Sequence, residues 1–213
     1  MRDVWRKTGR GLALTLFTMG SIAVAAYAFT YFRMPHNIGN PFDANFATSG
    51  FDVPGHFFGA GLALLLAPLQ LSRTVRRRWP RLHRLGGWLS AGGILIGALS
   101  GLSLSTHSQG GAASGIGFAL LAPTWLFVTG NGIRYALAGD TERHRRWMSR
   151  SAALTFSAVT LRLILAAGTI LGMPFGDTYI FAAWACWPIN LAVCEIILRW
   201  PGRRMPEAIA SVA

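Results

Sequence analysis

Apolar residues gather into six long runs along the chain, separated by shorter polar segments. The runs cover residues 11–32, 56–71, 86–105, 115–137, 148–172 and 178–198. With its flanking residues, each run is long enough to cross a hydrocarbon core about 30 Å thick, because an α-helix rises about 1.5 Å per residue. The pattern predicts an all-α fold: a polytopic integral membrane protein built as a six-transmembrane-helix bundle.

Positive charge falls on alternate connections between these runs. Of the 20 Lys and Arg residues, all but Arg33 and Arg162 lie at the two termini or at the second and fourth connections and the helix ends beside them. Cytoplasmic segments of membrane proteins are enriched in Lys and Arg, so both the N-terminus and the C-terminus are predicted to be cytoplasmic. Anchoring to anionic lipid accounts for the formal net charge of +12, and no nucleic-acid partner is expected.

The composition leaves room for one membrane domain and little else. The chain has 213 residues, of which 52% are hydrophobic and 13% charged, and its connections are short. We therefore expect a single membrane domain over residues 1–213. The longest connection, residues 33–54, is predicted to cap the outer face of the bundle. Cys186 and Cys194 lie too far apart on one predicted helix to form a disulfide.

Local signals place several helix ends. Pro80 is expected to begin the third helix, and the fourth is expected to end at Ala138-Gly139. Asp140 or Thr141 is expected to cap the fifth helix. The arginine-rich stretch Ser72–Leu82 is predicted to be an inner loop.

Two histidines enter the membrane from the arginine-rich side at similar depth. His83 and His144 lie in the first turns of the third and fifth helices, and each is followed by an arginine, Arg84 or Arg145. If these helices are diagonal neighbours, the two imidazoles have the geometry of axial ligands to a haem b iron, with the two arginines beside the propionates. Alternatively, both are interfacial histidines that bond headgroups or each other.

A second polar site is expected toward the outer side. His56 lies near the outer end of the second helix, and Arg162 lies deep within the fifth. A guanidinium inside the membrane needs a carboxylate, backbone carbonyls, water or a ligand. Asp52 and Asp177 are the candidate acids, whereas a haem propionate or a quinone carbonyl are the candidate ligands. His107, in a flexible polar turn, is expected to be structural or solvated.

The sixth run carries two further polar residues, Asn190 and Glu195. Glu195 is expected to neutralise Arg150 or Arg145, or else to support the imidazole of His144. No three or four ligands converge at one depth for zinc.

Several motifs resemble an uncharacterised bacterial family of membrane proteins, the domain of unknown function 2306. They include Gly55-His56-Phe57-Phe58-Gly59, Leu82-His83-Arg84-Leu85-Gly86 and His144-Arg145-Arg146-Trp147-Met148. The resemblance covers about Pro54 to Glu195 and is in keeping with a multi-pass protein of the bacterial inner membrane. It implies no particular activity.

The layout also resembles that of cytochrome b561, which has six spans and two haems. Its ligand histidines alternate between the outer and inner ends of helices two to five. His56, His83 and His144 stand at the matching ends here, but the fourth helix, Gly115–Leu137, holds no histidine, and only His107 just before it offers a substitute. The resemblance therefore implies one inner haem and leaves a second, outer haem without an evident ligand.

Two hypotheses from different classes follow. In the first, the protein is a b-type haem or quinone-linked electron-transfer protein, a possible membrane oxidoreductase, and His56 with Arg162 receives a quinone or small reductant. In the second, it is a cofactor-free transporter of small molecules or ions, or a structural membrane subunit. A hydrated path would then be lined by His56, Arg162, Asn190 and Glu195.

Overall fold

The protein is a bundle of membrane-length helices. A computed structural model describes residues 2–31 and 50–199, and these residues form helices and turns with no strand. Within this part of the chain, six segments are long and apolar enough to span a membrane: Gly11–Thr30, Asp52–Leu71, Pro80–Ser105, Gly111–Leu137, Thr141–Ile170 and Phe175–Arg199. The predicted all-α, six-span architecture is confirmed.

Several helices extend beyond the apolar runs because polar first turns continue the helical backbone. In chain order the elements are α1 (Arg2–Thr30), α3 (Asp52–Leu71), α4 (Arg73–Arg78), α5 (Pro80–Ser105), α6 (Gly111–Leu137), α7 (Thr141–Thr155), α8 (Ser157–Ile170) and α9 (Phe175–Arg199). Most of the predicted outer cap, residues 33–54, lies outside the described residues, and its last part belongs to α3.

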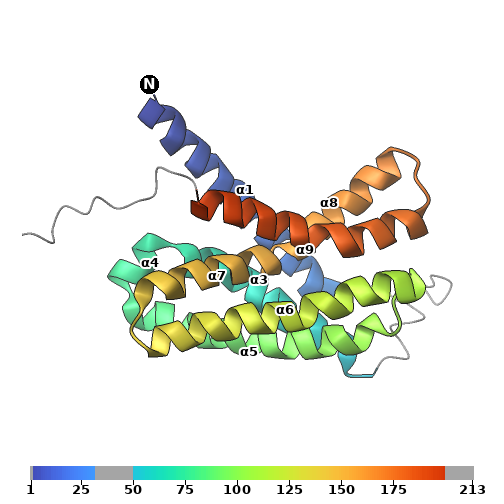
Figure 1. Ribbon diagram of the computed structural model, residues 1–213, viewed down its shortest axis with the longest axis horizontal. Helices are drawn as coiled ribbons and strands as arrows, with labels where there is room; N and C mark the ends of the chain where they lie inside the picture. Colours follow the sequence, from blue (N-terminus) through green and yellow to red (C-terminus); the bar gives the residue numbers. More distant parts are fainter. Residues whose placement is uncertain (1, 32–49, 200–213) are drawn as a thin grey trace, which may run out of the picture.

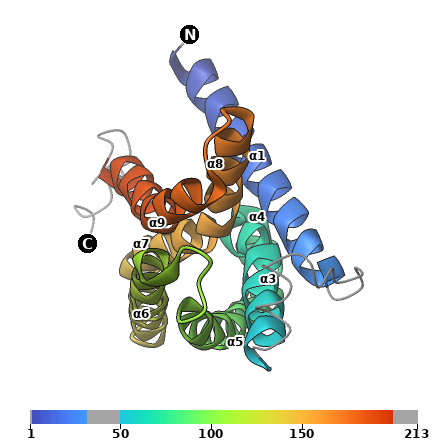
Figure 2. The same ribbon diagram turned by 90° about the vertical axis from the view of Figure 1, so that its right-hand side faces the viewer.

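Four helices form a closed ring. α3 packs on α5, α5 on α6, α6 on α7, and α7 on α3, so α5 and α7 stand diagonally across the bundle (Figure 2). α1 lies against α3 and α8, outside the ring. α9 packs on α6, α7 and α8, and α8 diverges from the ring toward its C-terminal end (Figure 1).

The contact between α3 and α5 is made by glycines at backbone distance. A Cβ atom on Gly59 would lie 2.6 Å from the Gly93 carbonyl oxygen and 2.6 Å from the Gly97 nitrogen. Small residues allow membrane helices to approach this closely, and the gain is van der Waals contact and not hydrophobic burial. The close approach fixes the position of α3, which carries His56.

The centre of the ring is filled by a tryptophan. Trp125 of α6 packs in a cluster with Ala63, Ile94, Ala98, Ala122, Val128 and Leu154. Its Nε1–H donates to Thr155 Oγ1 over 3.2 Å, and the Thr129 and Ser151 hydroxyls join α6 to α7 over 2.7 Å. Large exposed apolar side chains cover the outer faces of the helices, as a lipid-facing surface requires.

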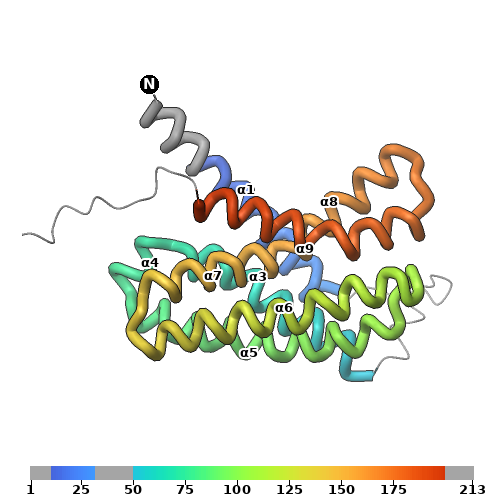
Figure 3. The backbone as a smooth tube through the Cα atoms, in the orientation of Figure 1, coloured from blue at the N-terminus to red at the C-terminus, as the bar shows by residue number. Residues whose placement is uncertain are grey.

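The fifth span, predicted as one helix over residues 148–172, is divided at Phe156. α7 ends at Thr155 and α8 begins at Ser157, and the backbone changes direction between them (Figure 3). The Thr155 hydroxyl donates to the Ser151 carbonyl oxygen over 2.8 Å, a back-bond of the kind that bends helices. The result is that α7 belongs to the ring while α8 leaves it.

Several predicted helix ends are confirmed. Pro80 is the first residue of α5, and Asp140 caps α7 by accepting the Arg143 N–H over 2.9 Å. Gly139, after the end of α6, has a φ of 75°, which favours glycine.

The prediction of a loop over Ser72–Leu82 is wrong. Arg73–Arg78 form the short helix α4, because Ser72 caps it by accepting the Val75 N–H over 3.3 Å and the Val75 side chain is buried. The arginine run is thus held against the bundle.

Basic residues gather at one end of the molecule, here called the arginine-rich end. It contains α4, the α6–α7 turn and the last turn of α9, which lie together at the left in Figure 1. The basic segments that the charge pattern placed on one side of the membrane thus lie at one end of the structure. That this side is cytoplasmic stays a prediction from charge.

Candidate functional site

Two histidines lie at the arginine-rich end of the ring, on helices that stand diagonally across from each other. His83 lies in the first turn of α5 and His144 in the first turn of α7, and both side chains are half-buried. The two helices are diagonal members of the ring, as the inner-site prediction assumed. A haem between the two imidazoles stays a prediction.

His144 is oriented by the neighbouring helix. Its Nδ1 lies 2.8 Å from the carbonyl oxygen of Gly132 on α6. A carbonyl oxygen only accepts, so Nδ1 carries the proton and the neutral ring keeps its lone pair on Nε2. The Met148 side chain occupies the place where a Cβ atom on Gly132 would stand, which explains the need for glycine.

His83 is held by Gln70, from the last turn of α3. In the amide orientation that satisfies both of its groups, the Gln70 nitrogen donates to the His83 carbonyl oxygen and Nδ1, each over 3.1 Å. The amide oxygen accepts the Gly87 N–H over 3.1 Å. With Nδ1 accepting, the neutral His83 ring carries its proton on Nε2.

The arginines near this pair differ from those expected. Arg145 forms an exposed ion pair with Glu142, 2.7 Å long, and Arg84 is exposed. The arginine whose charge acts on His83 is Arg76 of α4. Sequence reasoning missed Gln70, Arg76 and Gly132, and no pattern in the sequence indicates the contact of Gln70 with α5.

His56, of the predicted outer site, is held by α5. His56 Nδ1 lies 2.7 Å from the Gly97 carbonyl oxygen, and the charge of Arg162 acts on His56. A Cβ atom on Gly101 would lie 2.8 Å from His56 Nδ1, so this part of α5 also needs glycine. A backbone carbonyl thus fixes the His56 ring as it fixes His144.

Arg162 has no carboxylate partner among the described residues. Its Nη1 donates to the Ala158 carbonyl oxygen over 2.9 Å, and its guanidinium carbon lies 5.1 Å from the centroid of the Tyr27 ring. Neither Asp52 nor Asp177 pairs with it in this part of the chain, and Asp52 instead accepts a hydrogen bond from Ser103. The ion pair expected as one alternative is replaced by a carbonyl and an aromatic face.

His107 is exposed at the end of α5, where the Thr106 hydroxyl lies 2.9 Å from its Nδ1. This local contact accords with a solvated role.

Glu195 has the ion pair that the sequence favoured. Its Oε1 lies 2.5 Å from Arg150 Nε, and its Oε2 lies 3.2 Å from Arg199 Nε. The partner of the His144 ring nitrogen is the Gly132 carbonyl. Glu195 therefore joins α7 to α9 at the arginine-rich end.

Asn190 of α9 is bonded to both sides of the break in the fifth span. Its amide nitrogen donates to the Ala153 carbonyl oxygen over 3.1 Å and to Ser157 Oγ over 3.4 Å. Its oxygen accepts from Thr160 Oγ1 over 2.9 Å. These contacts hold α9 against the α7–α8 junction.

Replacing Asn190 by leucine is expected to lower the free energy of unfolding by about 1–2 kcal/mol, because it leaves three polar groups without their interhelical partner. The thermal midpoint of the monodisperse protein in dodecyl maltoside measures the effect. Ile189→Leu, at an exposed neighbouring position, is the control and should leave the midpoint unchanged. Equal midpoints for both variants would contradict a stabilising role for Asn190.

These features define an α-helical multi-pass membrane protein that lies in a lipid bilayer, with one histidine pair at its arginine-rich end. A family model described as "Predicted membrane protein (DUF2306)" matches residues 53–198, and the chain belongs to this family. No curated protein and no solved structure matched the chain. The likeness to cytochrome b561 therefore stays a prediction from layout.

Proposed function

We propose that the protein is a membrane-embedded b-type cytochrome in which His83 and His144 bind one haem at the arginine-rich end. One observation carries the proposal: two histidines stand in the first turns of diagonal helices of a four-helix ring, at the same end of the bundle. Haem b in helical bundles is bound by histidines that come from two helices.

The ring nitrogens of His144 and His83 are not equally ready to bind iron. Iron binds a nitrogen lone pair, and His144 already presents Nε2 because its Nδ1–H is engaged by Gly132. For His83, iron binding through Nε2 would require the ring proton on Nδ1 and the Gln70 oxygen as its acceptor. Turning the amide over in place would set its oxygen against the His83 carbonyl oxygen and its N–H groups against the Gly87 N–H, so Gln70 would have to move away from both.

The residues around the pair would control its environment. The Gly132 carbonyl fixes the orientation of the His144 ring, and the charge of Arg76 suits an anionic propionate. The Trp125 cluster separates this end from the outer half of the ring. When bound, haem supplies one-electron transfer; the chain supplies its orientation and electrostatics.

The outer pair would receive the electron donor or acceptor. The Arg162 guanidinium lacks a described carboxylate partner and lies near His56, so the two offer hydrogen-bond donors to a quinone carbonyl or to a small anionic reductant. We place the protein in the inner membrane of a bacterium, with the arginine-rich end cytoplasmic.

Absorption spectroscopy tests the proposal. The protein, purified in mild detergent from cells supplied with a haem precursor, is expected to show a Soret band and, after dithionite reduction, a sharp α band. His83→Ala and His144→Ala should each lose both bands, whereas His107→Ala, at an exposed histidine, should keep them.

A wild-type protein that is colourless and stays so after added haem would overturn the cytochrome. It would favour the transporter hypothesis, in which Arg162 contacts an anionic solute. Uptake by proteoliposomes with wild-type and Arg162→Ala protein would then measure that activity.

A further inference from the structure

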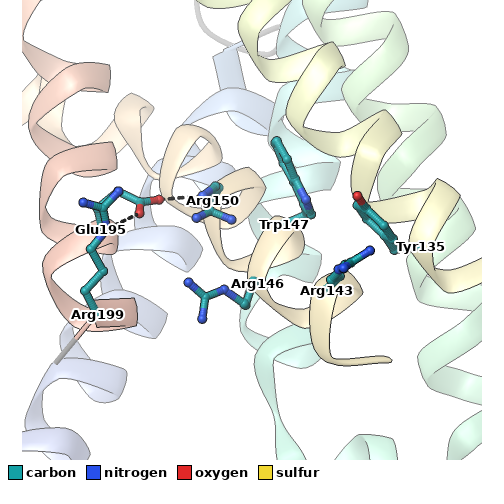
Figure 4. Close-up of a pocket in the computed structure, with 7 residues that line it drawn as sticks. All are labelled: Tyr135, Arg143, Arg146, Trp147, Arg150, Glu195 and Arg199. Atoms are coloured by element: carbon teal, nitrogen blue, oxygen red, sulfur yellow. Dashed lines mark hydrogen bonds and ion pairs between the residues drawn. The ribbon is translucent and has the colours of Figure 1, made fainter. Parts of the chain in front are cut away.

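A basic cavity at the arginine-rich end is lined by none of the residues of the two candidate sites. Its volume is about 410 Å³, and it is lined by Tyr135, Arg143, Arg146, Trp147, Arg150, Glu195 and Arg199. Figure 4 shows α7 side chains at its floor, with Tyr135 of α6 on one side and the Glu195–Arg199 pair of α9 on the other. We infer that this cavity binds the phosphate group of an anionic phospholipid.

The cavity holds more positive than negative charge. Four guanidinium groups line it, against one carboxylate, that of Glu195. Glu195 is shared between Arg150 and Arg199, and Arg143 pairs with Asp140 over 3.4 Å. Arg146 is half-buried and has no ion-pair partner among the described residues. A phosphate would supply the missing negative charge, and guanidinium groups bind phosphate oxygens through paired N–H donors.

Two aromatic rings hold the arginines in place before any ligand arrives. The guanidinium carbon of Arg143 lies 5.5 Å from the Tyr135 ring centroid, and that of Arg150 lies 5.1 Å from the Trp147 ring centroid. Such cation–π contacts restrict long side chains that would otherwise lose conformational freedom on binding. The cavity is thus partly preorganised for an anion.

The surroundings of the cavity favour a lipid over a soluble phosphate ester. Trp147 meets Phe127 edge to face, with ring centroids 5.8 Å apart, and Phe127 is 64% exposed on the lipid-facing side of α6. On α9, Val193 is exposed within one turn of Glu195, on the side toward the membrane centre. Apolar walls therefore continue from the basic cavity toward the membrane centre, where acyl chains would lie. Basic pockets between membrane helices bind lipid headgroups in this manner.

Thermal stabilisation in detergent tests the inference. Phosphatidylglycerol is expected to raise the melting midpoint of the wild-type protein in a saturable way, and phosphatidylcholine is not, because its headgroup carries no net charge. Arg146→Ala should raise the half-saturating concentration of phosphatidylglycerol about tenfold, because one charge-assisted hydrogen bond is lost. Arg77→Ala, at an exposed α4 arginine outside the cavity, is the matched control and should bind as the wild type does.

Two soluble phosphates and a second Arg146 variant complete the experiment. The phosphates distinguish a lipid ligand from a soluble one, and the variant distinguishes lost binding from lost folding. Glycerol phosphate and inorganic phosphate should produce no saturable shift; a shift by either that depends on Arg146 would keep the phosphate site but overturn its assignment to lipid. Arg146→Gln, which retains polar contacts without the charge, should repeat the loss seen for Arg146→Ala. Equal lipid binding by the Arg146 and Arg77 variants would overturn the inference. The result is independent of haem, since the cavity contains neither His83 nor His144.

Discussion

Gly59→Leu is expected to abolish folding of the helical ring, and Gly59→Ala to lower the free energy of unfolding by about 1–3 kcal/mol. The added Cβ would lie 2.6 Å from the carbonyl oxygen of Gly93 and 2.6 Å from the nitrogen of Gly97. Both atoms belong to the backbone of α5, so no side chain can turn aside to make room. Relief requires α3 and α5 to separate, and that separation also breaks the contact between His56 and Gly97.

The control lies on the same pair of helices. A Cβ atom on Gly92 of α5 would meet nothing within 4 Å, so Gly92→Ala should leave the stability unchanged or slightly raise it through helix propensity. The fraction of protein that stays monodisperse in size-exclusion chromatography after heating measures both variants. If Gly59→Ala and Gly92→Ala were equally stable, the close packing of α3 on α5 would not be a determinant of the fold.

Trp125→Ala is expected to lower the free energy of unfolding by about 3–5 kcal/mol, the second large effect. Trp125 is 6% exposed at the centre of the ring, and its removal leaves a cavity between α3, α5, α6 and α7. The substitution also removes the hydrogen bond from the indole to Thr155, next to the break in the fifth span. Because four helices line the gap, the ring cannot close it by moving one of them.

Two further variants separate the contributions. Trp88→Ala removes an indole that is 56% exposed on α5 and should change the unfolding free energy little. Trp125→Phe keeps most of the volume but loses the Nε1–H donor, so it should cost about 1 kcal/mol. The midpoint of thermal unfolding in detergent ranks the three, and a Trp88→Ala defect as large as that of Trp125→Ala would refute the assignment of the core.

The helices and several of their ends were predictable because their signals are local. Length and hydropathy define the six spans, while Pro80, Asp140 and Gly139 act within one turn of where they stand. α4 was missed for a tertiary reason: an arginine run is typical of an exposed loop, and only the burial of Val75 against the bundle holds it as a helix.

The candidate site was predictable only in its histidines. Depth along a helix follows from counting residues, so His83 and His144 could be placed at one level. Their supporting groups come from other helices: Gln70 from α3 and the Gly132 carbonyl from α6. Such contacts depend on how helices rotate and pack, which a periodic pattern does not specify.

Arg162 shows the limit of searching for charge partners by residue type. A buried guanidinium suggests a nearby acid, and Asp52 and Asp177 were the candidates. The path of α1 instead brings the Tyr27 ring beneath it, an aromatic partner that no charge pattern indicates. The surroundings of Arg162 are thus set by the helix that crosses outside the ring.

The break at Phe156 places His144 and Arg162, which share one predicted span, on two separate helix segments. His144 is on α7, which is held by α3, α6 and α9, whereas Arg162 is on α8, whose neighbours are α9, α1 and the end of α7. Bonds from Asn190 of α9 to Ala153 and Ser157 cross this break, so α9 sets the angle between α7 and α8. The orientation of α9 therefore determines where Arg162 stands relative to the ring, whereas His144 keeps its place through the Gly132 carbonyl of α6.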